Sequence, residues 1–220
     1  MRTDRRLGRT LGLSMLATFV VGLVSNFKLQ DALFADGGLL INAAVQPSKI
    51  GLICLMGMVT SLLSLWVAGR LESSFPRYEV LRLYRAVLVA GLATTLMEFS
   101  TLQAFRELSE AHLAAEGAGT HAVAAIALSG LRNGTHFLDK VLGGFSVMLL
   151  FGFMYSAQVL PRSIAIAGMF GALAQVLAVG RALFGFDVAY GLLVPLSLAF
   201  LVTMGWLIAK GFNVREEVLD

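Results

Sequence analysis

His136-Phe-Leu-Asp139-Lys140-Val-Leu-Gly143-Gly144 opens the segment that decides the fold. Three ionisable side chains lie within five residues, and an uncharged run then continues as far as Pro161-Arg162. His136, Asp139 and Lys140 are spaced i, i+3 and i+4, which places them on one face of a helix. The pattern predicts a membrane-spanning helix with a cluster of polar groups at its start.

The composition is that of a membrane protein. Of the 220 residues, 57% are hydrophobic and 14% are charged, whereas soluble domains carry roughly 25% charged residues. A bilayer core needs about 20 apolar residues per helix. We therefore expect an all-α polytopic membrane protein, with six transmembrane helices in one bundle that forms a single domain over residues 1–220. The predicted spans cover about 10–27, 50–69, 86–105, 141–160, 163–180 and 188–209.

Charge and cysteine content exclude several classes of protein. The net charge of +3 is modest, and no basic run is interleaved with aromatic residues, so we expect no nucleic-acid partner. Cys54 is the single cysteine, which excludes an intrachain disulfide and a thiolate metal cluster; we interpret it as a small buried hydrophobe. The basic N-terminus before the first span lacks a small-x-small cleavage site, so we expect a retained first helix and not a signal peptide.

Orientation follows from the Lys and Arg residues that flank the spans. If both termini are cytoplasmic, the inner flanks hold Arg2, Arg5, Arg6, Arg9, Arg70, Arg77, Arg82, Arg85, Arg162, Lys210 and Arg215. The outer flanks then hold Lys28, Lys49, Arg106, Arg132, Lys140 and Arg181. The excess on the first side favours cytoplasmic termini and two long extracytoplasmic loops, 29–48 and 107–133.

The connections and the small residues complete the expected architecture. Pro161 predicts a tight turn between the fourth and fifth spans. Residues 107–115 should continue the third span as a helix, and 116–119 should break it. Residues 120–131 form a predicted short apolar helix in the membrane interface, ended by Asn133-Gly134.

Small residues in two spans predict close helix packing. These are Gly57, Ser61, Ser64 and Ala68 in the second span, and Gly168, Gly171, Ala172 and Gln175 in the fifth. Pro195 lies inside the sixth predicted span, where it predicts a kink.

Glu98 is the one ionisable residue deep inside a predicted span, and such residues are costly and commonly functional. Gln175 lies at a similar depth, and Lys140 can extend its stem toward a carboxylate. We hypothesise an outward-facing polar ligand-binding pocket. Its candidate residues are Glu98, His136, Asp139, Lys140 and Gln175, with Arg132 and Arg181 at the rim. The competing interpretation is a Glu98–Lys140 ion pair that only fixes helix packing.

The histidines do not indicate a cofactor. His112, His121 and His136 all fall on the predicted outer side, and none lies in the middle of a span, as a bis-histidine haem requires. His112 and Glu116 are spaced i, i+4 and offer a divalent-ion site, but a solvated helix face is favoured, so we expect no metal site. Neither HExxH nor Gly-x-Ser-x-Gly occurs. His136 with Asp139 could act as an acid and base, but no nucleophile accompanies them.

Three groups of residues resemble one family of bacterial membrane proteins, the domain of unknown function 4386. They are Leu83-Tyr84-Arg85, the run Phe151-Gly152-Phe153 to Leu160-Pro161-Arg162 and Gly168, and the closing Trp206-Leu207-Ile208-Ala209-Lys210-Gly211-Phe212. The resemblance implies six spans and a bacterial inner membrane. It implies no activity, so no catalytic residue or cofactor follows from it.

The sequence thus favours a binding or accessory role over catalysis. We expect a small-ligand or ion binding or sensing protein, or an accessory subunit of a membrane complex. An intramembrane enzyme acting on lipid or isoprenoid substrates is the first alternative, and a small permease is the second. The expected partner is the lipid bilayer, and both a membrane-protein partner and a homo-oligomer stay open.

Overall fold

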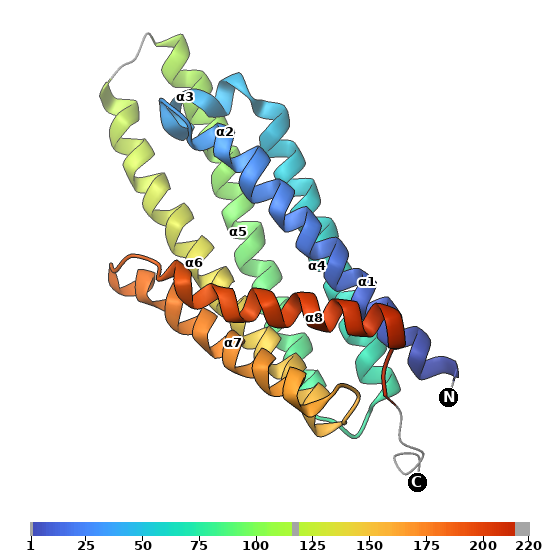
Figure 1. Cartoon of the computed structure of the whole chain (residues 1–220). Helices are drawn as coiled ribbons and strands as arrows, with labels where there is room; N and C mark the ends of the chain where they lie inside the picture. The colour runs from blue at the N-terminus through green and yellow to red at the C-terminus, as the bar shows by residue number, and fades with distance from the viewer. Residues whose placement is uncertain (1, 116–118, 214–220) are drawn as a thin grey trace. The chain divides into compact units, whose positions relative to one another are not determined.

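The computed structural model describes residues 2–115 and 119–213, and all of its regular structure is helical within them. Its elements in chain order are α1 (Arg2–Val24), η1 (Ser25–Gln30), α2 (Asp31–Phe34), α3 (Gly38–Val45), α4 (Pro47–Ser74), α5 (Val80–Ala114), α6 (Gly119–Ser156), α7 (Arg162–Gly180), η2 (Arg181–Phe184), η3 (Tyr190–Leu193) and α8 (Val194–Lys210). Figure 1 shows these helices coloured along the chain.

Six helical segments in the described residues are long and apolar enough to cross a membrane. They are Arg5–Phe34, Pro47–Ser74, Val80–Ala114, Gly119–Ser156, Arg162–Phe184 and Tyr190–Lys210. Large apolar side chains such as Leu52, Leu55 and Val59 of α4 are exposed by 44%, 59% and 56%, as expected where lipid replaces water around the helix. The predicted fold class, an all-α polytopic membrane protein, is confirmed.

The chain divides into two compact units. Unit 1 comprises Met1–Ala17, Leu62–Gly91 and Phe137–Asp220, and unit 2 comprises Thr18–Ser61 and Leu92–His136. The division falls inside α1, α4, α5 and α6, so each of these helices contributes to both units.

Unit 1 depends on helices that approach closely at glycines. In Figure 1, α7 and α8 run side by side, and a Cβ built on Gly171 of α7 would lie 2.7 Å from the Cα of Leu196 in α8. A Cβ on Gly168 would lie 2.4 Å from the ring of Phe151 in α6. Both glycines are buried, so the predicted packing role of small residues in this span is confirmed.

The start of α1 also contacts the segment just after α8 within unit 1. A Cβ on Gly8 of α1 would lie 2.3 Å from the backbone nitrogen of Phe212, just after α8. The Phe212 side chain is 2% exposed, and its ring lies 5.9 Å from that of Phe75. The Asn213 N–H then donates to the carbonyl of Val159 at 2.9 Å. The segment after α8 therefore lies against α1 at Gly8, and it is held by aromatic packing on Phe75 and by a backbone hydrogen bond to Val159.

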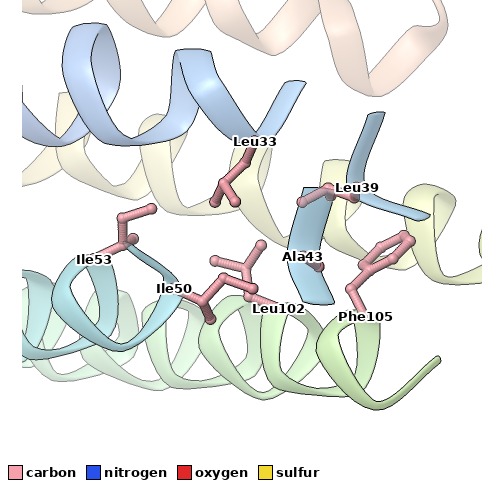
Figure 2. Close-up of a cluster of buried hydrophobic side chains, with 7 residues drawn as sticks. All are labelled: Leu33, Leu39, Ala43, Ile50, Ile53, Leu102 and Phe105. Carbon is pink, nitrogen blue, oxygen red and sulfur yellow. The ribbon is translucent and has the colours of Figure 1, made fainter. Parts of the chain in front are cut away.

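Unit 2 has its own apolar core, which Figure 2 shows in close-up. Side chains from α2, α3, α4 and α5 point toward one another there; they are Leu33, Leu39, Ala43, Ile50, Ile53, Leu102 and Phe105. The Asn42 amide donates to backbone oxygens of the α2–α3 turn, including Asp36 at 3.2 Å. Ser109 of α5 donates to the Ile41 carbonyl and accepts from the Ala44 N–H at 2.9 Å. The short helices α2 and α3 are thus an ordered part of the unit.

Two predictions about helix ends are confirmed and one is wrong. Residues 107–114 continue α5 as predicted, and Pro161 precedes α7 directly after a short turn. Asn133-Gly134 does not end a helix, because α6 runs unbroken from Gly119 to Ser156. At about 1.5 Å per residue α6 exceeds a hydrocarbon core of about 30 Å. Of the predicted break at 116–119, residues 116–118 lie outside the described part of the chain, and Gly119 begins α6. Glu116 of the His112–Glu116 pair also lies outside the described part.

The predicted kink at Pro195 is also wrong. The last helix, α8, begins at Val194, so Pro195 lies in its first turn. Proline is tolerated there because the first N–H groups of a helix have no partner within the helix. The preceding residues Tyr190–Leu193 form the separate 3-10 helix η3.

Candidate functional site

Glu98 of α5 lies in a buried charged cluster of unit 2. One of its carboxylate oxygens, Oε1, is 3.2 Å from Nη2 of Arg132 and 3.0 Å from Nδ1 of His136. The Glu98 and Arg132 side chains are only 7% and 9% exposed, and that of His136 is 22% exposed. A single carboxylate oxygen therefore faces both a guanidinium and an imidazole with little access to solvent.

Arg132 extends the cluster to the first span. Its Nη2 donates to Oε1 of Gln30 at 3.0 Å, and its guanidinium lies over the ring of Phe34, 4.6 Å from the centroid. Its Nη1 lies 3.4 Å from Oδ1 of Asn133. The third nitrogen, Nε, is buried and has no hydrogen-bond partner among the described residues. The guanidinium is thus held in place through Nη1 and Nη2 while Nε stays without a partner.

Local backbone geometry explains why these side chains meet. Arg132 and His136 are spaced i, i+4 on α6 and so share one face. This spacing holds because α6 continues through Asn133-Gly134. On the first span, Gln30 ends the π-helical turn Ser25–Gln30. Such wide turns are uncommon and are frequently found at functional sites.

Three other candidate residues lie together in unit 1. Lys140 and Asp139 form an ion pair, with 3.0 Å between Nζ and Oδ2, and their side chains are 42% and 19% exposed. The Gln175 amide of α7 donates to the Lys140 carbonyl of α6 at 3.1 Å. This bond spans two helices beside Gly144, where a Cβ would lie 2.6 Å from Val176. Gln175 therefore acts as a polar link between closely packed helices.

Six of the seven candidate residues are joined to other candidates within their own unit. Glu98, Arg132 and His136 are joined in unit 2, and Asp139, Lys140 and Gln175 are joined in unit 1. Arg181 lies in η2, where its guanidinium is 5.9 Å from the Phe186 ring. Arg132 is buried, with 7% of the residue exposed, although it was expected at a rim. A pocket that includes all seven residues stays a prediction.

The residues of the charged cluster in unit 2 are best suited to binding a ligand. Arginine presents a planar fork of donors that suits carboxylate and phosphate oxygens. The Glu98–His136 contact also has the length of a hydrogen bond between an acid and a base. Among the described residues, no group of three or more His, Cys, Asp and Glu side chains is arranged to hold a metal ion.

Sequence reasoning missed two contributors to the cluster, Gln30 and Phe34. Both belong to a stretch that was expected to be an extracytoplasmic loop, but the structure has helices there. The pairing of Arg132 with His136 did have a sequence signal, the i, i+4 spacing. That signal was hidden by the helix end predicted at Asn133-Gly134.

Comparison with known proteins identifies the family. Neither a curated protein nor a solved structure matches the chain. The model of one family, described as Domain of unknown function (DUF4386), matches residues 10–211. This match covers all six candidate spans almost completely. The chain therefore belongs to the DUF4386 family of membrane-spanning helical proteins.

Proposed function

We propose that this protein is a non-enzymatic binding protein of the membrane, and that the Glu98–Arg132–His136 cluster is its ligand site. The observation that carries the proposal is the buried Arg132 guanidinium, which keeps one donor without a partner. A buried donor without an acceptor is destabilising, and ionisable groups inside spans commonly mark functional sites. A ligand oxygen at Nε would complete the hydrogen bonding of the guanidinium.

The chemistry of the cluster specifies the ligand class. A small molecule with a carboxylate or phosphate group fits best, because these groups match the planar donors of arginine. Glu98 holds the guanidinium in position, and His136 supplies a second polar group on the same face of α6. The Phe34 ring covers one face of the guanidinium, so a ligand would bind in the plane of the guanidinium donors.

The proposal is tested with acetate and inorganic phosphate as probes. The protein is reconstituted in nanodiscs, and its thermal unfolding is followed while either probe replaces chloride at constant ionic strength. We expect a saturable rise in the unfolding midpoint with at least one probe; a ligand at 100 times its Kd stabilises by about 2.7 kcal/mol.

Arg132→Lys is the matched variant, since it keeps the positive charge next to Glu98 and removes the planar fork. The rise should disappear in Arg132→Lys and persist in Lys140→Gln, which alters an exposed cation of unit 1. No saturable rise with either probe, or an equal rise in Arg132→Lys, would contradict the proposal.

For the cellular setting, we propose a bacterial cytoplasmic membrane with both termini in the cytoplasm and one transmembrane domain. The support is the excess of Lys and Arg in the flanks assigned to that side. Reporter fusions at each terminus test the orientation, and activity of a periplasm-specific reporter at either end would contradict it. An accessory role in a membrane complex is compatible with ligand binding and is tested by the oligomeric state of the solubilised protein.

An intramembrane enzyme is the second candidate function. It is favoured by one observation, the 3.0 Å contact between the Glu98 carboxylate and the His136 imidazole, which could transfer a proton to or from a lipid substrate. This function predicts turnover of a lipid or isoprenoid substrate that His136→Ala abolishes while the protein stays folded. Lipid extracts incubated with the purified protein and analysed by mass spectrometry separate this candidate from simple binding.

A further inference from the structure

A pair of histidines lies apart from the charged cluster, near the other end of α5. His112 is in the last turn of α5, and His121 is in the first turn of α6. Their rings contact each other edge to face, with centroids 5.6 Å apart and an interplanar angle of 81°. His112 is 14 residues beyond Glu98, which corresponds to about 21 Å along the helix. The pair is therefore a separate feature of unit 2.

Both rings leave one nitrogen unused. Nδ1 of His112 and Nδ1 of His121 are buried, and neither has a hydrogen-bond partner among the described residues. Each neutral imidazole has one nitrogen that donates and one that accepts. Because the two rings are in contact, a single ligand could bind both of these buried nitrogens.

We propose that His112 and His121 together bind one divalent transition-metal ion, such as Zn²⁺, with water as the remaining ligands. Neutral imidazole is a preferred ligand of these ions. With Zn–N bonds of about 2.0–2.1 Å, the centroids of two imidazoles on one ion are about 5–6 Å apart. The observed 5.6 Å lies in that interval, so the spacing of the two rings is compatible with a shared ion.

Acidic residues outnumber basic residues in unit 2 as a whole. Unit 2 contains six Asp and Glu residues and four Lys and Arg residues. Glu107 and Glu110 lie five and two residues before His112 and are exposed, and both pair with Arg106. The carboxylates are thus already engaged by Arg106, and the imidazoles are the groups left to bind the ion.

A bound ion would also link two helix ends. α5 ends at Ala114 and α6 begins at Gly119, so an ion held by both histidines closes a short loop. Because the second imidazole is tethered to the first, binding to the pair should exceed binding to a single imidazole by about a hundredfold or more. The ion should stabilise the folded protein in proportion to its occupancy.

The experiment uses the full chain in detergent micelles, purified with a tag that contains no histidine. Co²⁺ is titrated and followed by its visible absorption, and Zn²⁺ is then added as a competitor. We expect one ion per chain and a rise in the thermal unfolding midpoint. His112→Ala and His121→Ala should each weaken binding by about a hundredfold or more, because either change leaves a single imidazole.

The control variant is Glu107→Gln/Glu110→Gln, which removes the nearby carboxylates and leaves both imidazoles. It should retain one ion per chain. Thermal unfolding in the absence of metal verifies that each variant is folded, and His112→Gln replaces His112→Ala if the alanine variant is not. The proposal is overturned if no ion binds, if each histidine variant loses only about half of the binding, or if the glutamine double variant loses it.

Discussion

Unit 1 and unit 2 are stabilised in different ways. Unit 1 brings helices together at glycines, where α1 meets the segment after α8 and where α7 meets α6 and α8. Unit 2 has an apolar cluster (Figure 2) and, beside it, the charged cluster of Glu98, Arg132 and His136. Unit 1 contains 13 of the 17 Lys and Arg residues, whereas unit 2 contains all three histidines.

Unit 1 therefore depends on close helix packing, whereas unit 2 contains buried charged groups. A close helix contact at glycine is sensitive to added volume, because an interior packed at high density has no room for a methyl group. A buried charge pair is sensitive to the loss of one partner, because the other charge is then buried alone. Substitutions in the two units should therefore have different signatures.

The largest expected loss of stability comes from Arg132→Leu in unit 2. It leaves the Glu98 carboxylate buried without its cation, and breaking a buried pair costs about 3–5 kcal/mol. Lys140→Leu on the same helix is the matched change in unit 1. Lys140 is 42% exposed, and exposed pairs contribute only about 0–1 kcal/mol. Chemical unfolding in detergent measures both, and equal losses for the two variants would remove the distinction between the units.

The next effect belongs to unit 1. Gly8→Ala should destabilise by roughly 1–3 kcal/mol, because the new Cβ would lie 2.3 Å from a backbone atom of Phe212. Gly22→Ala on the same helix is the control, since a Cβ there meets nothing within 4 Å. It should be neutral, or stabilising by up to about 1 kcal/mol. Thermal unfolding compares the pair, and a Gly8→Ala variant as stable as Gly22→Ala would contradict the close contact.

An expected loss of stability of similar size tests how α3 is attached in unit 2. Ser109 is fully buried and hydrogen-bonds to the Ile41 carbonyl and the Ala44 N–H. Ser109→Ala should cost about 1–3 kcal/mol, since it leaves both backbone groups without this partner. Ser100 is an exposed serine of the same helix whose hydroxyl donates to the Leu96 carbonyl, and Ser100→Ala should change stability by less than about 0.5 kcal/mol. Hydrogen exchange at Ala44 should accelerate in Ser109→Ala alone; an unchanged rate would argue against the attachment.

The smallest expected loss of stability comes from a substitution in unit 1. Gln175→Leu removes the hydrogen bond from α7 to the Lys140 carbonyl. Hydrogen bonds between membrane helices contribute about 0.6 kcal/mol on average, so we expect a loss of that size. A reversible unfolding titration with several replicates is needed to detect it. A loss as large as that of Arg132→Leu would mean that unit 1 also depends on a buried polar group.

The six membrane spans could be predicted from the sequence because the patterns that mark them involve only neighbouring residues. Uncharged runs of bilayer length and the turn at Pro161 depend on neighbouring residues alone. Asn133-Gly134 misled because these residues disfavour helices in isolation, while tertiary packing overrides such propensities within a long helix. The kink predicted at Pro195 was wrong because the position of a proline relative to the start of a helix decides whether it kinks that helix.

Only part of the candidate site could be predicted from the sequence. Glu98 could be identified because an acid in an apolar run stands out, and His136 because it lies at the start of a polar cluster. Their joint partner Arg132 was assigned to a loop, since the helix that carries it was expected to end one residue earlier. The contact between His112 and His121 depends on two different helices, so no local pattern could reveal it.

The double variant Glu98→Leu/Arg132→Leu tests the central claim, that the charged cluster binds a ligand, most directly. Replacing both members of a buried pair by apolar residues is often neutral for stability, so the variant should unfold near the midpoint of the unaltered protein. The account predicts that the saturable rise in this midpoint with acetate or phosphate is then absent. A stable double variant that still shows the full rise would contradict it.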